Sequence, residues 1–183
     1  MQMSVTVRNA RLDAIESAIG TSALLEFFSG AMPANCAAAD AGTKLASCAL
    51  PSDWMAAASA GSKAKSGTWQ DASADANGLV RHYRVKDSGG SACHLQGLVS
   101  MPHAVSTAVQ VGQQMHNAGN VYVVTTAGTT GASSPPTGTG TGISDGTVTW
   151  NYVGPVEMTI DNVDIASGQQ VTVTGYTLNE GGA

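Results

Sequence analysis

The chain has 183 residues, 8 basic and 13 acidic side chains and a net charge of −5. This length suits one domain, or one domain with an insertion, and allows a substantial hydrophobic core. Charged residues make up 11% of the sequence, against about 25% in ordinary soluble domains, so the predicted surface is neutral and rich in hydroxyl groups. The scattered basic residues exclude most nucleic-acid binders, because phosphate contacts need clustered lysine or arginine.

No apolar run approaches the roughly 18 residues that a membrane span needs, and residues 1–11 lack the apolar stretch of a signal peptide. We therefore expect synthesis in the cytoplasm and no membrane partner. The three cysteines are Cys36, Cys48 and Cys93, and an odd count without a signal peptide predicts reduced, buried thiols. The alternative is a Cys36–Cys48 disulfide that forms after the protein leaves the cell.

A short amphipathic helix is predicted near the N-terminus. Asn9 can cap it, and Leu12, Ile15 and Ile19 lie on one helical face. Gly20 follows at the position where glycine commonly ends a helix.

Two compact apolar runs follow the helix, at residues 23–28 and 44–50. Each has the length and composition of a strand, and Pro51 ends the second. Ser52 or Asp53 could then cap a helical turn through residues 54–58.

A β-hairpin is predicted next. Residues 79–86 alternate in polarity, residues 87–90 are the turn sequence DSGG, and residues 93–100 supply the second strand. Further strand patterns lie at residues 156–160 and 170–178. We place residues 93–100 and 156–160 in one sandwich.

The intervening segment behaves differently. Strand patterns at residues 105–111, 121–126 and 147–153 surround a long loop rich in Gly, Thr, Ser and Pro. We interpret this segment as an insertion near a hairpin tip, where insertions are tolerated because the entropy cost of loop closure rises slowly with length.

The predicted fold is therefore mostly β. We expect a β-sandwich or partly open barrel of about seven to nine strands, with a short N-terminal helix and a small inserted β-module. Residues 1–100 and 156–183 would form the sandwich body, and residues 101–155 the inserted module.

Zinc binding is a weak alternative. His82 and His94 lie on strands that could pair, and Cys93 with Cys36 or Cys48 could complete a ligand set. Zinc sites usually show tight local spacing such as CxxC or HxxxH, which this chain lacks. We expect exposed strand histidines and buried thiols instead.

Carboxylates near the end of the chain could suggest calcium or glycosidase chemistry, but their spacing matches neither. Calcium loops alternate oxygen ligands around a glycine, and paired catalytic carboxylates cannot be identified from spacing alone. Turn formation is the simpler explanation. The carboxylates in question are Asp145, Glu157, Asp161 and Asp164. No catalytic, cofactor-binding or metal-binding residue is predicted anywhere in the chain.

Tyr122, Trp150 and Tyr152 are the best candidates for a surface recognition site. Trp150 and Tyr152 alternate on one strand and so share a face. Aromatic rings among hydroxyls and amides can bind the apolar face of a sugar. The alternative is that these rings form the small core of the module.

A resemblance supports a function. The segment YVVTTAGTTGASSPP…DGTVTWNYVG resembles a small β-module of tailed-phage structural proteins. The flanking stretches VRNARLDAIESAIGTSALLEFFSGAMPANC, LPSDWMAAASAG and DNVDIASGQQVTVTGYTL also resemble a phage virion protein. The matching module residues are Tyr122, Gly128, Thr129, Thr130, Gly131, Pro135, Asp145, Gly146, Thr147, Val148, Trp150, Tyr152 and Gly154.

The resemblance implies virion assembly and supplies no catalytic residues. We expect a non-enzymatic capsid decoration or cement protein, located in the virion, whose body binds the head lattice and whose module faces outward. Its partners would be the major capsid protein or other virion proteins, and further copies of itself in a homo-oligomer. The alternatives are a neck, tail or fibre component, or a carbohydrate-binding module that touches a host-surface glycan with Trp150 and Tyr152.

Overall fold

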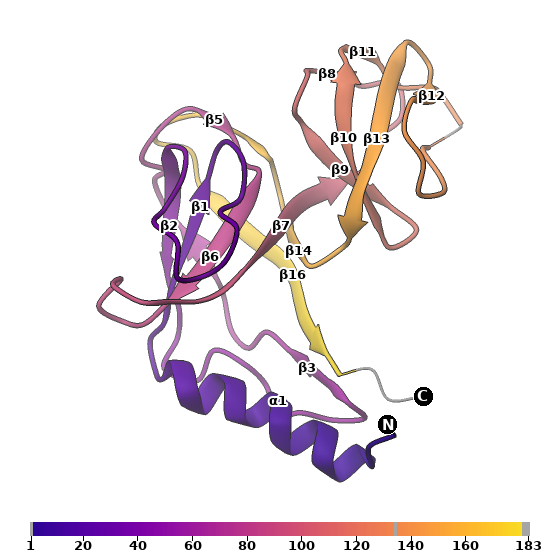
Figure 1. Cartoon of the computed structure of the whole chain (residues 1–183). Helices are drawn as coiled ribbons and strands as arrows, with labels where there is room; N and C mark the ends of the chain where they lie inside the picture. The colour runs from indigo at the N-terminus through magenta and orange to yellow at the C-terminus, as the bar shows by residue number, and fades with distance from the viewer. Residues whose placement is uncertain (1, 134, 181–183) are drawn as a thin grey trace.

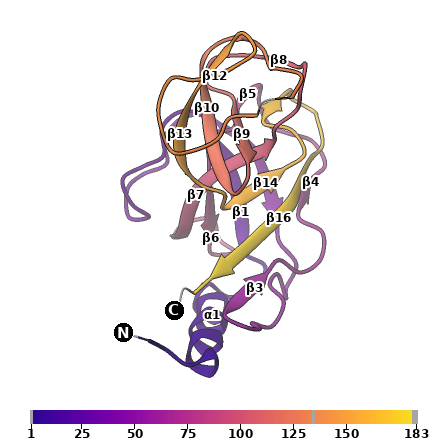
Figure 2. The ribbon, with the colours of Figure 1, turned by 90° about the vertical axis from the view of Figure 1, so that its right-hand side faces the viewer.

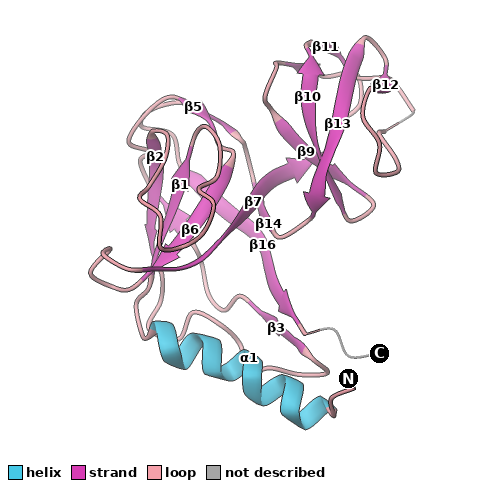
Figure 3. Cartoon of the chain, viewed as in Figure 1, coloured by secondary structure: helices cyan, strands magenta, loops and turns pink. Residues whose placement is uncertain are grey.

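The computed structural model of the chain describes residues 2–133 and 135–180. Strands dominate it, and a single helix lies near the N-terminus (Figure 3). The elements in chain order are α1 (Val5–Ile19), β1 (Leu24–Phe28), β2 (Lys44–Ala49), β3 (Ser62–Ala64), β4 (Gln70–Asp71), β5 (Gly78–Leu79), β6 (His82–Lys86), β7 (Cys93–Pro102), β8 (Ala108–Val109), β9 (Gln114–Asn117), β10 (Asn120–Thr126), β11 (Gly128–Thr129), β12 (Ile143–Asp145), β13 (Val148–Pro155), β14 (Met158–Ile160), β15 (Asp164–Ile165) and β16 (Val171–Asn179).

The prediction of a mostly β fold with one short N-terminal helix is confirmed. The sheets are sandwich-like and do not close into a barrel. The described residues form sixteen strands, more than the seven to nine expected. Five of these strands have only two residues, which is too short for a sequence pattern to reveal.

Helix α1 starts earlier than predicted. It begins at Val5, and Ser4 caps it by accepting a hydrogen bond from the backbone N–H of Val7 at 3.3 Å. Its C-terminal end is as predicted, because Gly20 adopts a φ of 91° there. Among the described residues, no helix has the length and apolar character that a membrane crossing requires.

Polar side chains dock this helix onto the chain that follows it. Asn9, Asp13 and Glu16 lie three or four residues apart and so share a face. Each accepts one backbone hydrogen bond: Asn9 from the N–H of Gly61 at 2.9 Å, Asp13 from that of Ala58 at 3.0 Å and Glu16 from that of Met55 at 3.0 Å. The buried ammonium of Lys63 then lies 2.8 Å from Asp13 and 3.0 Å from Glu16.

The helical turn predicted at residues 54–58 is wrong. Met55 forms a β-bridge with Lys65, and the N–H of Ala56 donates to the carbonyl of Ala64 at 2.9 Å. The N–H groups of Met55 and Ala58 donate to Glu16 and Asp13 of α1, which holds the segment in a non-helical conformation. Local alanine content predicted a helix that these tertiary hydrogen bonds prevent.

The predicted hairpin is present. Strand β6 pairs antiparallel with β7 across the turn at Asp87, and β1 pairs with both β6 and β2. The outer edge of β2 is covered rather than open, because Asp71 accepts a hydrogen bond from the N–H of Ser47 at 2.7 Å. The N–H of Asp75 also donates to the carbonyl of Leu45 on this edge.

The core of the body lies between these strands and β14, β16 and the segments around β3 and β4. Its centre is a run of tilted and edge-on aromatic contacts that links Trp54, Trp69, Tyr176 and Tyr83, with ring centroids 5.4–5.8 Å apart. All four side chains are buried, so this aromatic run anchors one continuous hydrophobic core.

A second hydrophobic core lies within the predicted module. Strand β10 pairs with β13 on one side and β9 on the other, and the module lies away from α1 in both views (Figures 1 and 2). Its buried apolar residues are Val109, Met115, Tyr122, Val124, Val148 and Trp150. We call them the module core.

Strand β7 connects the two cores. Its first half pairs with β6, Val99 is then opposite Met158 of β14, and Met101 is opposite Met115 of β9. Met101 packs against both cores. The division between residues 100 and 101 stays a prediction, because a continuous strand runs through that point.

Candidate functional site

The structure does not place the predicted recognition residues together at the surface. Tyr122 and Trp150 are both 0% exposed and belong to the module core. Tyr152 is partly buried and meets Tyr122 edge-on, with ring centroids 6.2 Å apart. A surface role for Tyr122 and Trp150 is therefore wrong. The two rings instead pack inside the module, which was the alternative.

Asp145 organises the module from inside. Its buried side chain accepts hydrogen bonds from Nε2 of His103 at 2.7 Å, the N–H of Gly131 at 2.7 Å and Nε1 of Trp150 at 3.3 Å. The His103 and Trp150 rings also contact each other at 5.9 Å. One carboxylate thus joins three separate segments, which is more than the turn role predicted for it.

The motif residues of the segment that resembles a phage module contact one another. The hydroxyl of Thr147 accepts from the N–H of Thr129 at 2.8 Å, and the N–H of Thr147 donates back to the Thr129 carbonyl at 3.0 Å. A methyl group on Gly146, whose φ is 62°, would overlap that carbonyl. A methyl group on Gly131 would lie 2.8 Å from Asp145. These positions therefore serve the fold of the module, with no need for a ligand.

The long loop of the module is tied down. The hydroxyl of Tyr122 donates to the carbonyl of Gly138 at 2.9 Å, and the N–H of Tyr152 donates to the carbonyl of Gly140 at 3.0 Å. Asn117 adds a hydrogen bond to the carbonyl of Pro136 at 3.1 Å. Strands β9, β10 and β13 thus hold three carbonyl groups of this loop.

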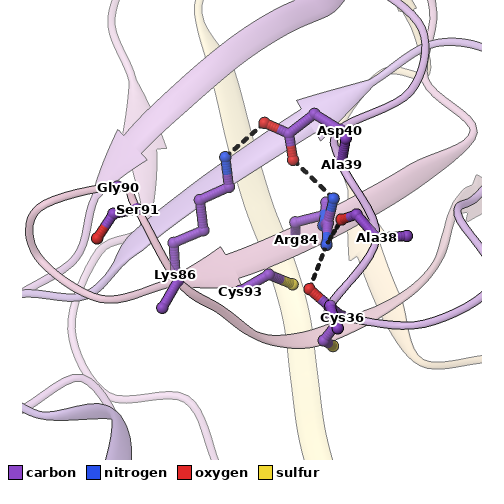
Figure 4. A pocket seen from close by; sticks show the side chains of 11 residues that line it. Cys36, Ala38, Ala39, Asp40, Arg84, Lys86, Gly90, Ser91 and Cys93 are labelled. Carbon is purple, nitrogen blue, oxygen red and sulfur yellow. Dashed lines mark hydrogen bonds and ion pairs between the residues drawn. The ribbon is translucent and has the colours of Figure 1, made fainter.

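One pocket of the body is polar, with a volume of about 480 Å³ (Figure 4). It lies where the loop of residues 29–43 covers the β6–β7 hairpin. Arg84 anchors this loop by donating to Asp40 at 2.7 Å and to the carbonyls of Cys36 and Ala38 at 2.8 and 3.0 Å. Lys86 donates to the second oxygen of Asp40 at 2.6 Å.

The charges of this pocket are balanced internally. Arg84 and Lys86 are almost fully buried, and Lys86 also lies 2.6 Å from Glu26. Burial alone would raise the pKa of Asp40, but its hydrogen bonds to Lys86 and Arg84 lower it below the usual value. The pocket therefore presents two cations already paired with two carboxylates, which leaves little field for an incoming anion.

A second groove, of about 430 Å³, lies between β7 and the end of β16. Glu157 lies in it, with a pKa that burial raises, and accepts a hydrogen bond from the N–H of Leu98 at 2.6 Å. Of the described residues that line the groove, Glu157 is the one carboxylate. The hydroxyl groups of Tyr83 and Tyr176 are 3.4 Å apart nearby. Glu157 thus caps a strand edge and has no carboxylate partner in the described lining.

The remaining carboxylates and histidines have separate roles. Asp161 forms a turn as expected, because it accepts from the N–H of Asn162 at 2.9 Å, whereas Asp164 accepts from Gln110 at 2.6 Å. His94 is exposed as expected, but His82 is fully buried and stacks on Phe28 at 5.4 Å. In the part of the chain that the structure describes, no three His, Cys, Asp or Glu side chains are grouped to hold a metal ion.

The comparisons with known proteins identify no relative. No protein-family model matches the chain, and no curated protein or solved structure matches it either.

Proposed function

We propose that this chain is a non-enzymatic structural protein of a tailed-phage virion, and most specifically a capsid decoration protein. In this proposal the body binds the head lattice and the module faces outward. The major capsid protein and further copies of this chain are the partners, and the protein is located in the virion after synthesis in the host cytoplasm.

The observation that carries the proposal is the module. Its sequence resembles a β-module of tailed-phage structural proteins. Within the module, the motif residues Asp145 and Thr147 form hydrogen bonds with other motif residues and so stabilise its fold. A module with a hydrophobic core of its own suits a part that is displayed. It also lies away from α1, so the body is free to contact a lattice (Figure 1).

The surface chemistry fits an adhesive role. Only 11% of the residues are charged, and the buried cations Lys63, Arg84 and Lys86 are paired inside the fold. Burial of neutral surface against a lattice gives each copy modest affinity. Repetition over many symmetric copies then supplies avidity. Sugar binding through Trp150 is not proposed, because its ring is buried.

Copy number tests the location. Purified particles would be digested, and peptides of this chain quantified by mass spectrometry against those of the major capsid protein. A ratio near one, or a simple lattice fraction of it, supports decoration. A ratio of a few per cent would place the protein in the neck, tail or fibre, and absence from particles would overturn the virion proposal.

Orientation can be tested with peptide tags. Thr139 in the module is exposed, and Gly168 in the body has open space around it, so a tag at either site would be accessible in the free protein. We expect antibody to bind intact particles that carry the Thr139 tag. A matched chain tagged after Gly168 controls for exposure in the free protein. Particles whose Thr139 tag is hidden while the Gly168 tag is accessible would reverse the proposed orientation.

A further inference from the structure

Two cysteines line the polar pocket of the body. Cys36 comes from the loop of residues 29–43 and Cys93 from the start of β7, and both are partly exposed and line the same pocket (Figure 4). Arg84 lines the pocket with both: it donates to the carbonyl of Cys36 at 2.8 Å, and the Cys93 thiol is one of the groups that raise the pKa of Arg84. Burial, and then a hydrogen bond to the Cys93 thiol, raises the pKa of Cys36 to about 11.

The third cysteine lies elsewhere. Cys48 is 0% exposed on β2 and belongs to the body core. Burial raises its pKa to about 12, and the charges that act on it are those of Asp71 and Asp161 rather than another thiol. The Cys36–Cys48 alternative considered from the sequence therefore pairs the wrong residues.

We propose that Cys36 and Cys93 are a disulfide-forming pair that cross-links the loop of residues 29–43 to the β6–β7 hairpin under oxidising conditions. All three cysteines are unpaired in this structure, so it represents the reduced form. The inference rests on the pocket alone and stands or falls independently of the virion proposal.

The oxidant is a low-molecular-weight disulfide such as glutathione disulfide. One cysteine thiolate attacks a sulfur of glutathione disulfide, which forms a mixed disulfide and releases one glutathione thiolate. The second cysteine thiolate then attacks the protein sulfur of that mixed disulfide and releases the second glutathione thiolate. Two protein thiols are oxidised, one glutathione disulfide is reduced to two thiols, and the two protons go to solvent or to the released thiolates.

The disulfide would attach the loop of residues 29–43 covalently to the hairpin, whereas in this structure polar contacts hold that loop. Arg84 and Gln96 bind carbonyl groups of this loop, and Gln96 donates to Pro33 at 2.7 Å. A cross-link between residues 36 and 93 would restrict the unfolded chain strongly, because it closes a long loop. We expect oxidation to raise the melting temperature by roughly 5–15 °C.

Trypsin offers a direct test, because the cleavable residues separate the three cysteines. Residues 12–44 hold Cys36, residues 45–63 hold Cys48, and residues 87–183 hold Cys93. The folded full chain would be incubated with glutathione disulfide at mildly alkaline pH, alkylated, digested without reductant and mapped by mass spectrometry. We expect residues 12–44 linked to 87–183, with Cys48 alkylated after denaturation.

Variants separate the disulfide from a general effect of oxidation. Cys36→Ser and Cys93→Ser should each lose both the link and the rise in melting temperature, whereas the control Cys48→Ala should keep both. A link between residues 12–44 and 45–63 would overturn the proposal. Stable glutathione adducts on both Cys36 and Cys93, or cross-links only between chains on a non-reducing gel, would overturn it as well.

Discussion

The ammonium group of Lys63 lies 2.8 Å from Oδ1 of Asp13, and this contact fixes helix α1 to the body. Lys63 is 3% exposed and also lies 3.0 Å from Glu16. The helix is therefore attached by a buried cation between two of its own carboxylates, with Leu12 and Ile19 as its buried apolar residues. Its docking should depend on pH and on this one lysine.

The first prediction concerns the acid stability of the helix contact. Hydrogen bonds from Lys63, and then from the N–H of Ala58, lower the pKa of Asp13 below its ordinary 3.8. The contribution of Asp13 to stability is therefore complete above about pH 3.8 and is lost as the pH falls toward the lowered value. In Lys63→Met, the pKa of Asp13, measured by NMR titration, should rise toward 3.8.

The control for this experiment is Lys65→Met, two residues away. The ammonium group of Lys65 donates to the carbonyl of Gly67 and lies over the ring of Trp69, not beside the carboxylates of α1. An Asp13 pKa that moves equally in both variants would show that general charge, not the contact, sets it.

The second prediction concerns Asp145. Asp145→Ala leaves three donors without their acceptor, so we expect the free energy of unfolding to fall by about 2–4 kcal/mol. Urea denaturation would measure it, with Asp53→Ala as the matched control because Asp53 is exposed. Equal losses in the two variants would contradict an organising role for Asp145.

The third prediction compares two glycines in order to distinguish the cost of a steric clash from the cost of backbone strain at a positive φ. Gly146 and Gly142 have similar φ values of 62° and 68°, but a methyl group on Gly146 overlaps the carbonyl of Thr129 while one on Gly142 meets nothing within 4 Å. Gly142→Ala should cost about 1 kcal/mol from conformational strain. Gly146→Ala should cost about 2 kcal/mol more in urea denaturation, because the clash is added to the strain. Indistinguishable losses would argue that the turn at Gly146 can relax.

The fourth prediction concerns His82. Burial lowers the pKa of His82 below its ordinary 6.5, so the unfolded chain takes up a proton first as the pH falls. The stabilising effect of neutral His82 is therefore complete above about pH 6.5 and is lost below it. His82→Phe, which can keep the stacking on Phe28, should show a smaller loss of stability between about pH 7.5 and about pH 5.

His94→Phe is the control, because His94 is exposed on the neighbouring strand. It should keep the pH dependence of the natural chain. Burial also lowers the pKa of His116, so part of the dependence should persist in His82→Phe. A pH profile unchanged by His82→Phe would contradict the assignment.

The sequence predicted the strands that have long apolar or alternating patterns, such as β1, β6 and β16. It missed the start of α1, because Val5 and Val7 are β-branched and favour a strand locally, whereas Ser4 caps a helix. It also missed that residues 54–58 are not helical, since the cause is hydrogen bonding to side chains 39 and 45 residues earlier. Such tertiary partners leave no local pattern.

The candidate site was harder to predict than the fold. The motif around Asp145 and Trp150 was identified, but its partner His103 lies 42 residues before Asp145. Asp145 and Gly146 indicated a turn from the sequence. Only the structure shows that the Asp145 carboxylate is buried and therefore needs hydrogen-bond donors around it. Likewise, Cys36 and Cys93 line one pocket because Arg84 holds the loop of Cys36 against the β6–β7 hairpin, which no cysteine spacing could reveal.

Strand β7 can transmit force between the module and the body. It has 10 residues and so extends about 33 Å, from the hairpin with β6 to the pairing with β9 (Figure 1). A pull on the module along this strand would load the ladder between β6 and β7 lengthwise, so that its hydrogen bonds resist together in shear. Tension would thus enter the body along β7 as well as through the link from β13 to β14, and the module could bear force without its hydrogen bonds breaking one at a time.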